Sequence, residues 1–153
     1  MRGMRKLIPV LLVVAAASTV TLTGCSAVED MLYGEQTHQY DNINTLEADW
    51  TQAETVGWMP DDATDIRIRE STEGDVAILG FDSDSDLAES CVETERLSGP
   101  TFGDDWAPKK VYVDTVFACG AWAVIPTDDG WYGWTPSAPE EQKAATPEPG
   151  VTP

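Results

Sequence analysis

The residues with the clearest chemical potential form an acidic run near the middle of the chain. They occupy the first, third, fifth and twelfth positions of a calcium-binding loop pattern: Asp82, Asp84, Asp86 and Glu93. Carboxylate oxygens at these intervals suit the hard cation Ca²⁺, but the pattern requires glycine at its sixth position, where this chain has Leu87. The same residues also fit a helix that is capped by Ser83 or Asp84 and carries acidic residues in its first turn. We favour the helix over the metal site.

A pair of cysteines offers a second kind of chemistry. Cys91 and Cys119 both lie in the part of the chain that is predicted to fold. Outside the cytoplasm such a pair usually forms a disulfide, and closing a loop of this length would stabilise the fold by roughly 3–4 kcal/mol. Two buried thiols are the alternative. A zinc site is not expected, because the chain has no C-x-x-C motif and a single histidine, His38.

The motifs of the common catalytic classes are missing from the sequence. It contains no G-x-S-x-G, H-E-x-x-H, P-loop or dinucleotide-binding pattern, and one histidine makes a nucleophilic triad improbable. The 27 acidic residues are too many for any one carboxylate pair to indicate glycoside chemistry. We therefore predict a non-enzymatic protein without a cofactor.

A long irregular stretch and a group of aromatic residues are the candidates for a contact surface. Residues 93–110 contain glycines and prolines that interrupt regular structure, with Trp106 in their middle. Long ordered loops are often functional, so this stretch is the first candidate for contact with a ligand or partner, and a plain connector is the alternative.

Further on, Trp131, Tyr132 and Trp134 either stack on wall glycan or fill the core. The large area that tryptophan buries favours the core for most of the six tryptophans.

The N-terminus has the design of a bacterial export signal. Three basic residues precede an apolar segment, residues 7–20. A membrane-spanning helix needs about 20 apolar residues, so this segment is too short to span a membrane. The segment leads into Leu22-Thr23-Gly24-Cys25. This resembles the lipobox of bacterial lipoproteins, which implies that residues 1–24 are a signal peptide, removed before Cys25, and that the Cys25 sulfur is diacylated. We expect an acyl anchor in the lipid bilayer, with the folded part outside the cytoplasm.

The predicted mature chain is strongly acidic. Removal of residues 1–24 leaves six basic residues against 27 acidic ones, a formal charge of −21. Such a surface repels nucleic acid and anionic headgroups, so we exclude nucleic-acid binding and expect membrane contact through the acyl chains. Arg67 and Arg69 are expected to pair with nearby carboxylates, with an anion-binding role as the weaker alternative.

The remaining pattern predicts a small α+β domain over residues 42–134. Its antiparallel sheet combines a hairpin, 66–69 with 76–81, and a three-strand meander, 111–117, 122–125 and 131–134, whose last strand is placed at an edge. One or two helices pack on this sheet, the first over residues 42–54 with Asp41 or Asn42 as its N-cap.

Segments outside this domain are predicted to lack regular structure. Residues 25–41 form a flexible tether in which His38 is exposed and unpartnered, and residues 135–153 form a disordered, proline-rich tail.

In length, lipobox and composition the chain resembles short acidic lipoproteins of unknown function from high-GC Gram-positive bacteria. That resemblance implies the outer face of the cell membrane and carries no functional residues. We predict a non-enzymatic binding or interaction module of the cell envelope with a protein partner; a wall-glycan binder and a calcium-responsive domain are the alternatives.

Overall fold

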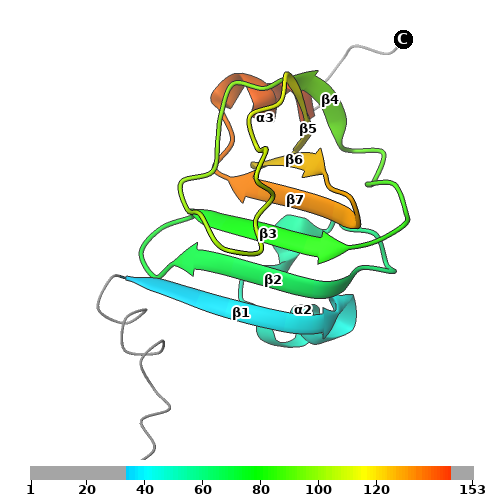
Figure 1. Ribbon diagram of the computed structural model, residues 1–153, viewed down its shortest axis with the longest axis vertical. Coiled ribbons are helices and arrows are strands. Elements are labelled where there is room, and N and C mark those ends of the chain that lie inside the picture. Colours follow the sequence, from blue (N-terminus) through cyan, green and yellow to red (C-terminus); the bar gives the residue numbers. More distant parts are fainter. Residues whose placement is uncertain (1–33, 146–153) are drawn as a thin grey trace, which may run out of the picture.

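The domain is built on one seven-stranded antiparallel sheet. The computed structural model describes residues 34–145, and within them the strand order is β1-β2-β3-β7-β6-β5-β4 (Figure 1). The strands are β1 Glu35–Asn42, β2 Thr64–Ser71, β3 Ala77–Asp82, β4 Val92–Glu95, β5 Thr115–Cys119, β6 Trp122–Pro126 and β7 Gly130–Thr135. Three short helical segments accompany them: α2 Ile43–Asp49, the 3₁₀ helix η1 Ala53–Val56 and α3 Pro139–Ala145. The predicted α+β class is confirmed.

Both predicted groups of strands are present. β2 and β3 form the hairpin, with Gly74 of its turn at a φ of 95°, and β5, β6 and β7 form the meander. The Asp-Gly turn before β7 is closed by a hydrogen bond of 2.8 Å from the Thr127 N–H to the Gly130 carbonyl. β7 is central rather than an edge strand, because it pairs with β3 as well as β6 and so joins the hairpin to the meander. The strand predicted over residues 111–117 begins only at Thr115.

The first strand lies inside the segment that was predicted to be a tether. β1 pairs with β2 from Glu35 to Asn42, so the tether prediction is wrong for residues 35–41. His38 is not unpartnered, because its Nε2 lies 2.9 Å from Oε1 of Glu70. Tyr40 is buried while its neighbours on either side are exposed, which is the alternation of a half-buried strand. The predicted lipid anchor at Cys25 and the signal peptide lie outside the described residues.

The helix predicted over residues 42–54 is present as α2 over Ile43–Asp49, followed by the 3₁₀ helix η1, whereas the predictions for residues 83–93 and for the tail are wrong. α2 begins after Asn42, whose side chain accepts from the Thr45 N–H as predicted for an N-cap. α3 lies within the predicted disordered tail, so that prediction is wrong for residues 139–145. Residues 83–93 form no helix, because the Ser83 hydroxyl donates to Asp62 and accepts from the Ser85 N–H, and such local bonds compete with helical ones.

The sheet is buried on both faces. Residues 43–63, which include α2 and η1, cover the face drawn at the back in Figure 1, where Trp50, Trp58 and Trp122 fill much of the core. The opposite face carries a second cluster that includes Tyr132 and Trp134. Residues 96–114, between β4 and β5, cross in front of that face, and we call them the covering loop. The core role predicted for most tryptophans is thus confirmed.

A disulfide links Cys91 to Cys119, as predicted. Val92 of β4 pairs with Ala118 of β5, so the two cysteines lie opposite each other at adjoining strand ends, with Cα atoms 4.4 Å apart. Cys119 is buried in the core, whereas β4 is a short, exposed edge strand. The bond therefore attaches this edge strand, and the start of the covering loop that follows it, to the body of the sheet.

Removing the disulfide should destabilise the domain strongly. For the double variant Cys91→Ala and Cys119→Ala we expect a loss of about 3–4 kcal/mol in the free energy of unfolding, because the 28-residue separation closes a loop that limits the unfolded chain. Urea unfolding of the variant and the oxidised protein measures this difference. Reduction of the wild-type protein should produce a similar loss, and unchanged unfolding midpoints in both experiments would contradict the prediction.

Candidate ligand-binding groove

The covering loop and the sheet beneath it enclose the candidate site. The larger hollow is a groove of about 720 Å³ between the Trp106–Lys110 part of the loop and the ends of β3, β6 and β7. A smaller hollow of about 420 Å³ lies within the loop itself. Tyr132 and Lys109 line both. Ligand pockets in proteins commonly measure about 300–1,000 Å³, so the groove is of a size to hold a small ligand.

Arg69 on β2 holds the outer part of the covering loop. Its guanidinium donates to the Gly103 carbonyl at 3.0 Å and to Asp104 Oδ2 at 3.3 Å, while it also pairs with Glu35 on β1. Its Cζ lies 5.9 Å from the centre of the Phe102 ring, which adds a cation–π contact. The expected pairing of Arg69 with carboxylates is confirmed, and it ties the loop to the two strands at that edge of the sheet.

Trp106 forms the inner wall of the groove because Gly80 leaves room for it. A Cβ at position 80 would lie 2.9 Å from Cζ3 of Trp106, so a glycine in β3 lets the indole rest directly on the strand backbone. The indole also meets Tyr132 edge-on, with ring centroids 6.0 Å apart. Trp106 is half-buried and lines the groove, so the structure places this predicted contact residue at the site.

A buried carboxylate fixes the start of the covering loop. Glu141 on α3 is fully buried and accepts from the backbone N–H groups of Leu97 and Ser98 at 2.7 and 3.1 Å, and from the Ser98 hydroxyl. It also accepts from the Ala138 N–H at 2.6 Å, which caps α3. Burial alone would raise the pKa of Glu141, but these hydrogen bonds outweigh it and hold the pKa below its usual value.

Tyr132 places an unpaired hydroxyl beneath both hollows. The residue is 1% exposed, and its hydroxyl has no hydrogen-bond partner among the described residues. Burial raises the pKa of Tyr132, and the nearby Asp104 and Tyr112 raise it further, so the hydroxyl keeps its proton and acts as a donor. An unpaired buried polar group costs about 1–3 kcal/mol, and an acceptor atom on a ligand would relieve that cost.

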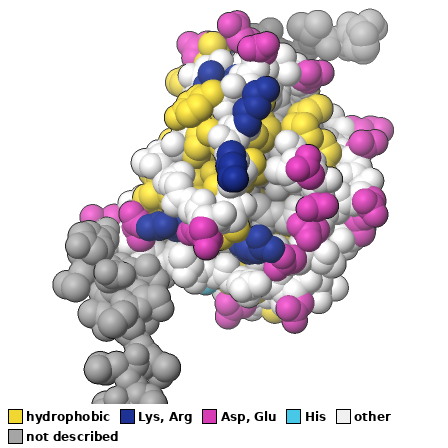
Figure 2. All heavy atoms as spheres, in the orientation of Figure 1, with side chains coloured by type: hydrophobic (Ala, Val, Ile, Leu, Met, Phe, Trp, Pro, Cys, Tyr) yellow, Lys and Arg dark blue, Asp and Glu magenta, His cyan; other side chains and the backbone are white. Residues whose placement is uncertain are grey.

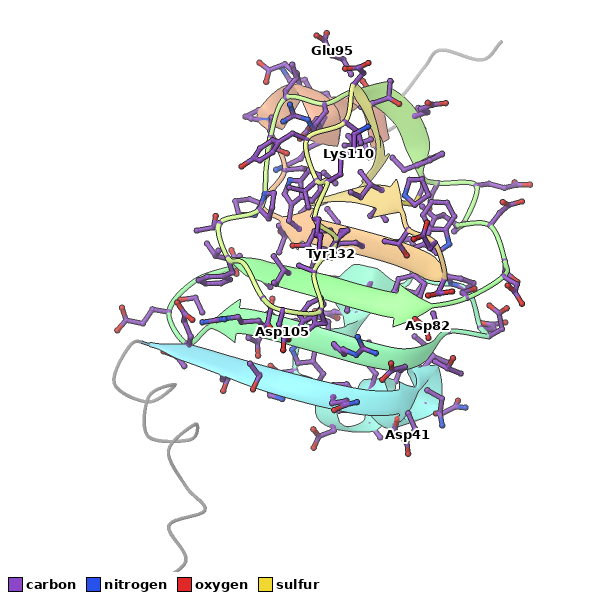
Figure 3. All side chains as sticks on the ribbon, viewed as in Figure 1. Asp41, Asp82, Glu95, Asp105, Lys110 and Tyr132 are labelled. Atoms are coloured by element: carbon purple, nitrogen blue, oxygen red, sulfur yellow. A yellow bond between two sulfur atoms is a disulfide. The ribbon has the colours of Figure 1, made fainter. Side chains whose placement is uncertain are left out.

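The rims of the groove carry opposite charges. Lys109 and Lys110 lie on the covering loop and are exposed, with no ion-pair partner in the described part of the chain. The acid rim is formed by residues at the end of β3 and in the turn before β7: Asp82, Asp128 and Asp129. In Figure 3 Tyr132 lies between the labelled Lys110 and Asp82. Figure 2 shows basic side chains in the middle of this face and acidic ones to their right.

The structure does not gather the predicted calcium ligands. Asp82 ends β3 on the groove rim, Asp84 and Asp86 lie in an exposed loop, and Glu93 on β4 accepts from the Thr115 hydroxyl at 2.9 Å. Within residues 34–145 no group of three or more His, Cys, Asp or Glu side chains could hold a metal ion. The four predicted ligands are therefore not assembled into one site among the described residues.

The predicted row of exposed aromatic residues is formed only in part. Trp131 is half-buried and lines the groove, and its Nε1 donates to the Ser85 carbonyl at 3.1 Å. Tyr132 is buried beneath the groove, and Trp134 is fully buried with its Nε1 bonded to the Ser98 hydroxyl. Sequence reasoning missed Lys109 and Lys110 as site residues. Their signal was the presence of two adjacent basic residues inside the predicted contact loop of a very acidic chain.

A second polar cluster surrounds Glu70 and has a structural role. The Glu70 side chain is 3% exposed, and its oxygens contact four polar side chains: Gln36, His38, Trp50 and Gln52. A buried carboxylate is stable only when hydrogen bonds replace its lost hydration, and these partners supply them. The cluster links β1 and β2 to the segment after α2, on the side of the sheet away from the groove.

Comparison with protein-family models, with curated protein sequences and with solved structures finds no match to this chain. Across residues 34–145, none of the helices has the length and apolar character needed to cross a membrane.

Glu141 should make the stability of the domain depend on acidic pH. Because the folded-state pKa lies below the ordinary value of 4.5, the carboxylate stabilises the fold above that pH, and this contribution is lost as the pH falls through the folded-state pKa. At neutral pH we expect Glu141→Gln to lower the free energy of unfolding by about 1–3 kcal/mol. Urea unfolding as a function of pH measures both effects. The exposed neighbour variant Glu140→Gln is the control, and an equal acid-induced loss in wild type and Glu141→Gln would contradict the assignment.

Proposed function

We propose that the protein is a lipid-anchored, extracytoplasmic binding module that holds a small ligand in the groove beneath its covering loop. The observation that carries the proposal is the groove itself, with a volume of about 720 Å³, indole walls from Trp106 and Trp131, and the unpaired Tyr132 hydroxyl below. A hollow of ligand size with aromatic walls and a few convergent polar groups is the usual form of a binding site. Its loop wall is held by Arg69 and Glu141, which suits a preformed site.

The anchored location is supported by the lipobox-like residues 22–25. Ten residues along the chain separate Cys25 from Glu35 at the start of β1, and a chain of that length spans at most about 35 Å. The sheet would therefore stay close to the outer face of the cell membrane, and the groove would meet ligands of the cell envelope.

Binding rather than catalysis is supported by the composition of the groove. Among residues 34–145, the groove is lined by charged groups from lysines, an arginine and aspartates, and by no serine, cysteine or histidine. His38 contacts Glu70 at 2.9 Å on the other side of the sheet. A nucleophile with an adjacent general base, the usual basis of covalent catalysis, is not assembled in the groove.

An envelope protein as partner is the second candidate. Three large apolar side chains are exposed on β4 and the covering loop: Val92 at 42%, Leu97 at 51% and Tyr112 at 68%. Exposed apolar side chains can take part in a protein contact. Such a contact would use the edge of the sheet near α3 and leave the groove open for its own ligand.

Lipidation of Cys25 can be tested directly. Cells that express the full chain and receive labelled palmitate should transfer the label to the protein, because the lipobox-like motif directs acyl chains to this sulfur. In Cys25→Ala the label should be lost and the protein should leave the membrane fraction. The double variant Cys91→Ala and Cys119→Ala serves as the control and should retain the label, whereas labelled Cys25→Ala would contradict the anchor.

Ligand binding in the groove can be tested by intrinsic fluorescence. We expect a saturable change in tryptophan emission when soluble cell-wall digests are titrated into the mature protein, because Trp106 and Trp131 line the groove. Trp106→Ala should weaken binding about tenfold or more, since buried indole contacts are among the strongest at binding sites. Val92→Ala, an exposed apolar position outside the groove, is the matched control. Urea unfolding checks that both variants are folded, and equal affinity of Trp106→Ala and wild type would contradict the site.

A further inference from the structure

The lysine rim differs from its surroundings in charge and in pairing. The chain has 27 acidic residues against nine basic ones, so a basic side chain has many carboxylates within reach. Arg67 and Arg69 are each paired with a carboxylate. Lys109 and Lys110 have no such partner within residues 34–145, although both line the groove. The covering loop therefore presents two free ammonium groups to a ligand.

Tyr132 adds a neutral donor at the same end of the groove. Tyr132 and Lys109 both line the groove and the smaller hollow next to it. The Tyr132 hydroxyl is unpaired and the residue is 1% exposed, so it is held in place without having a partner of its own. Ammonium groups and a phenol hydroxyl are all donors, and a carboxylate can accept from several donors at once. The carboxylate of Asp104, which lies near the Tyr132 hydroxyl, is paired with Arg69, so this end of the groove suits a ligand carboxylate.

The acid rim has the opposite character and an equally firm support. Asp82 lies opposite Gly130 in the β3–β7 pairing, and the Ser83 N–H donates to the Asp129 carbonyl at 3.1 Å. A Cβ at Gly130 would lie 2.2 Å from the Phe81 carbonyl oxygen, so the turn before β7 packs tightly on the end of β3. All three carboxylates are exposed and line this side of the groove, so the acid rim favours a cationic group of a ligand.

From these two rims we infer that the ligand of the groove is a short peptide that is bound through its own end charges. Its α-carboxylate would lie at Lys109, Lys110 and Tyr132, and its α-ammonium group at the acid rim. The indole of Trp106 lines the same groove and provides an apolar surface for the peptide's middle. The inference rests on the proposed function and names the ligand class of the same site.

Other ligand classes match these rims less well. A polyanion such as nucleic acid would meet Asp82, Asp128 and Asp129 with like charge, which strongly disfavours binding. A neutral glycan would cover charged groups on both rims without neutralising either, and burial of uncompensated charge is costly. A peptide with free ends compensates both rims and carries no net charge of its own.

The experiment compares one peptide pool in four chemical forms. A pool of tryptophan-free tetrapeptides with uncharged side chains is prepared with free ends, with an acetylated N-terminus, with an amidated C-terminus and with both ends blocked. Each form is equilibrated with the mature, acylated protein in detergent micelles, and retained peptides are measured by affinity selection and mass spectrometry. We expect retention to fall about fivefold when the N-terminus is blocked and about tenfold when the C-terminus is blocked, because Tyr132 adds to the lysines at that end.

Variants assign each end of the peptide to its rim. In Lys109→Gln with Lys110→Gln, the free pool should lose its advantage over the amidated pool but keep its advantage over the acetylated pool. In Asp128→Asn with Asp129→Asn, the reverse is expected. Lys143→Gln on α3 and the pair Glu73→Gln with Asp75→Asn, all exposed and outside both hollows, should leave both advantages intact.

The outcomes separate this inference from the proposed function. Equal retention of free and blocked pools would overturn the role of the end charges while groove binding stands. If no peptide pool is retained but wall digests still change tryptophan emission in a manner that depends on Trp106, the peptide assignment is overturned and the binding module remains. If neither binds, both fail. The inference is supported if the wild-type protein and the control variants keep both end preferences and each pair of rim variants loses the preference assigned to its rim.

Discussion

The whole structure depends on burying both faces of one sheet with a short chain. β3, β6 and β7 carry large apolar side chains on both sides, so each face needs its own cover. Residues 43–63 cover one face with two short helical segments and several tryptophans. The other face is covered by residues 96–114, which contain no helix or strand. A loop cannot fill a surface as evenly as a packed helix, and the groove is the space left between this loop and the strand ends.

The covering loop has no helix or strand, so side-chain contacts rather than regular backbone hydrogen bonds must hold it in place. Arg69 supplies one attachment through the Gly103 carbonyl and Asp104, and Trp106 supplies another by resting on the Gly80 backbone. Glu141 supplies the third by accepting from the first backbone groups of the loop. These contacts come from β2, β3 and α3, so two strands in one half of the sheet and a helix packed on β4 and β5 position the groove together. The same attachments that complete the core therefore also preform the site.

The sequence predicted the elements whose side chains alternate clearly or whose turns have distinct chemistry. The β2–β3 hairpin, the Asp-Gly turn before β7 and the Cys91–Cys119 bond belong to this class. β1 was hidden because most of its outward residues are polar and its buried carboxylate partner, Glu70, lies more than thirty residues away. α3 was hidden for a similar reason, since Glu141 is stabilised by Leu97 and Ser98, far from it in sequence. Trp106 was predicted as a contact residue because it is local to its loop, whereas the rims of the groove arise only from tertiary pairing.

The overall charge of the molecule bears on which ligand can reach such a groove. With 27 acidic against nine basic residues, the chain repels an anion at long range, even though Lys109 and Lys110 would attract it at contact. At physiological ionic strength this repulsion is screened beyond about 8 Å, but Asp82, Asp128 and Asp129 lie on the groove itself and so act at close range. A cationic ligand would be repelled by the ammonium groups of Lys109 and Lys110 at the lysine rim. A ligand with one charge of each sign and no net charge avoids both penalties, and its orientation is set by the rims. The acidic surface and the lysine pair therefore act together to select zwitterionic ligands over purely anionic ones.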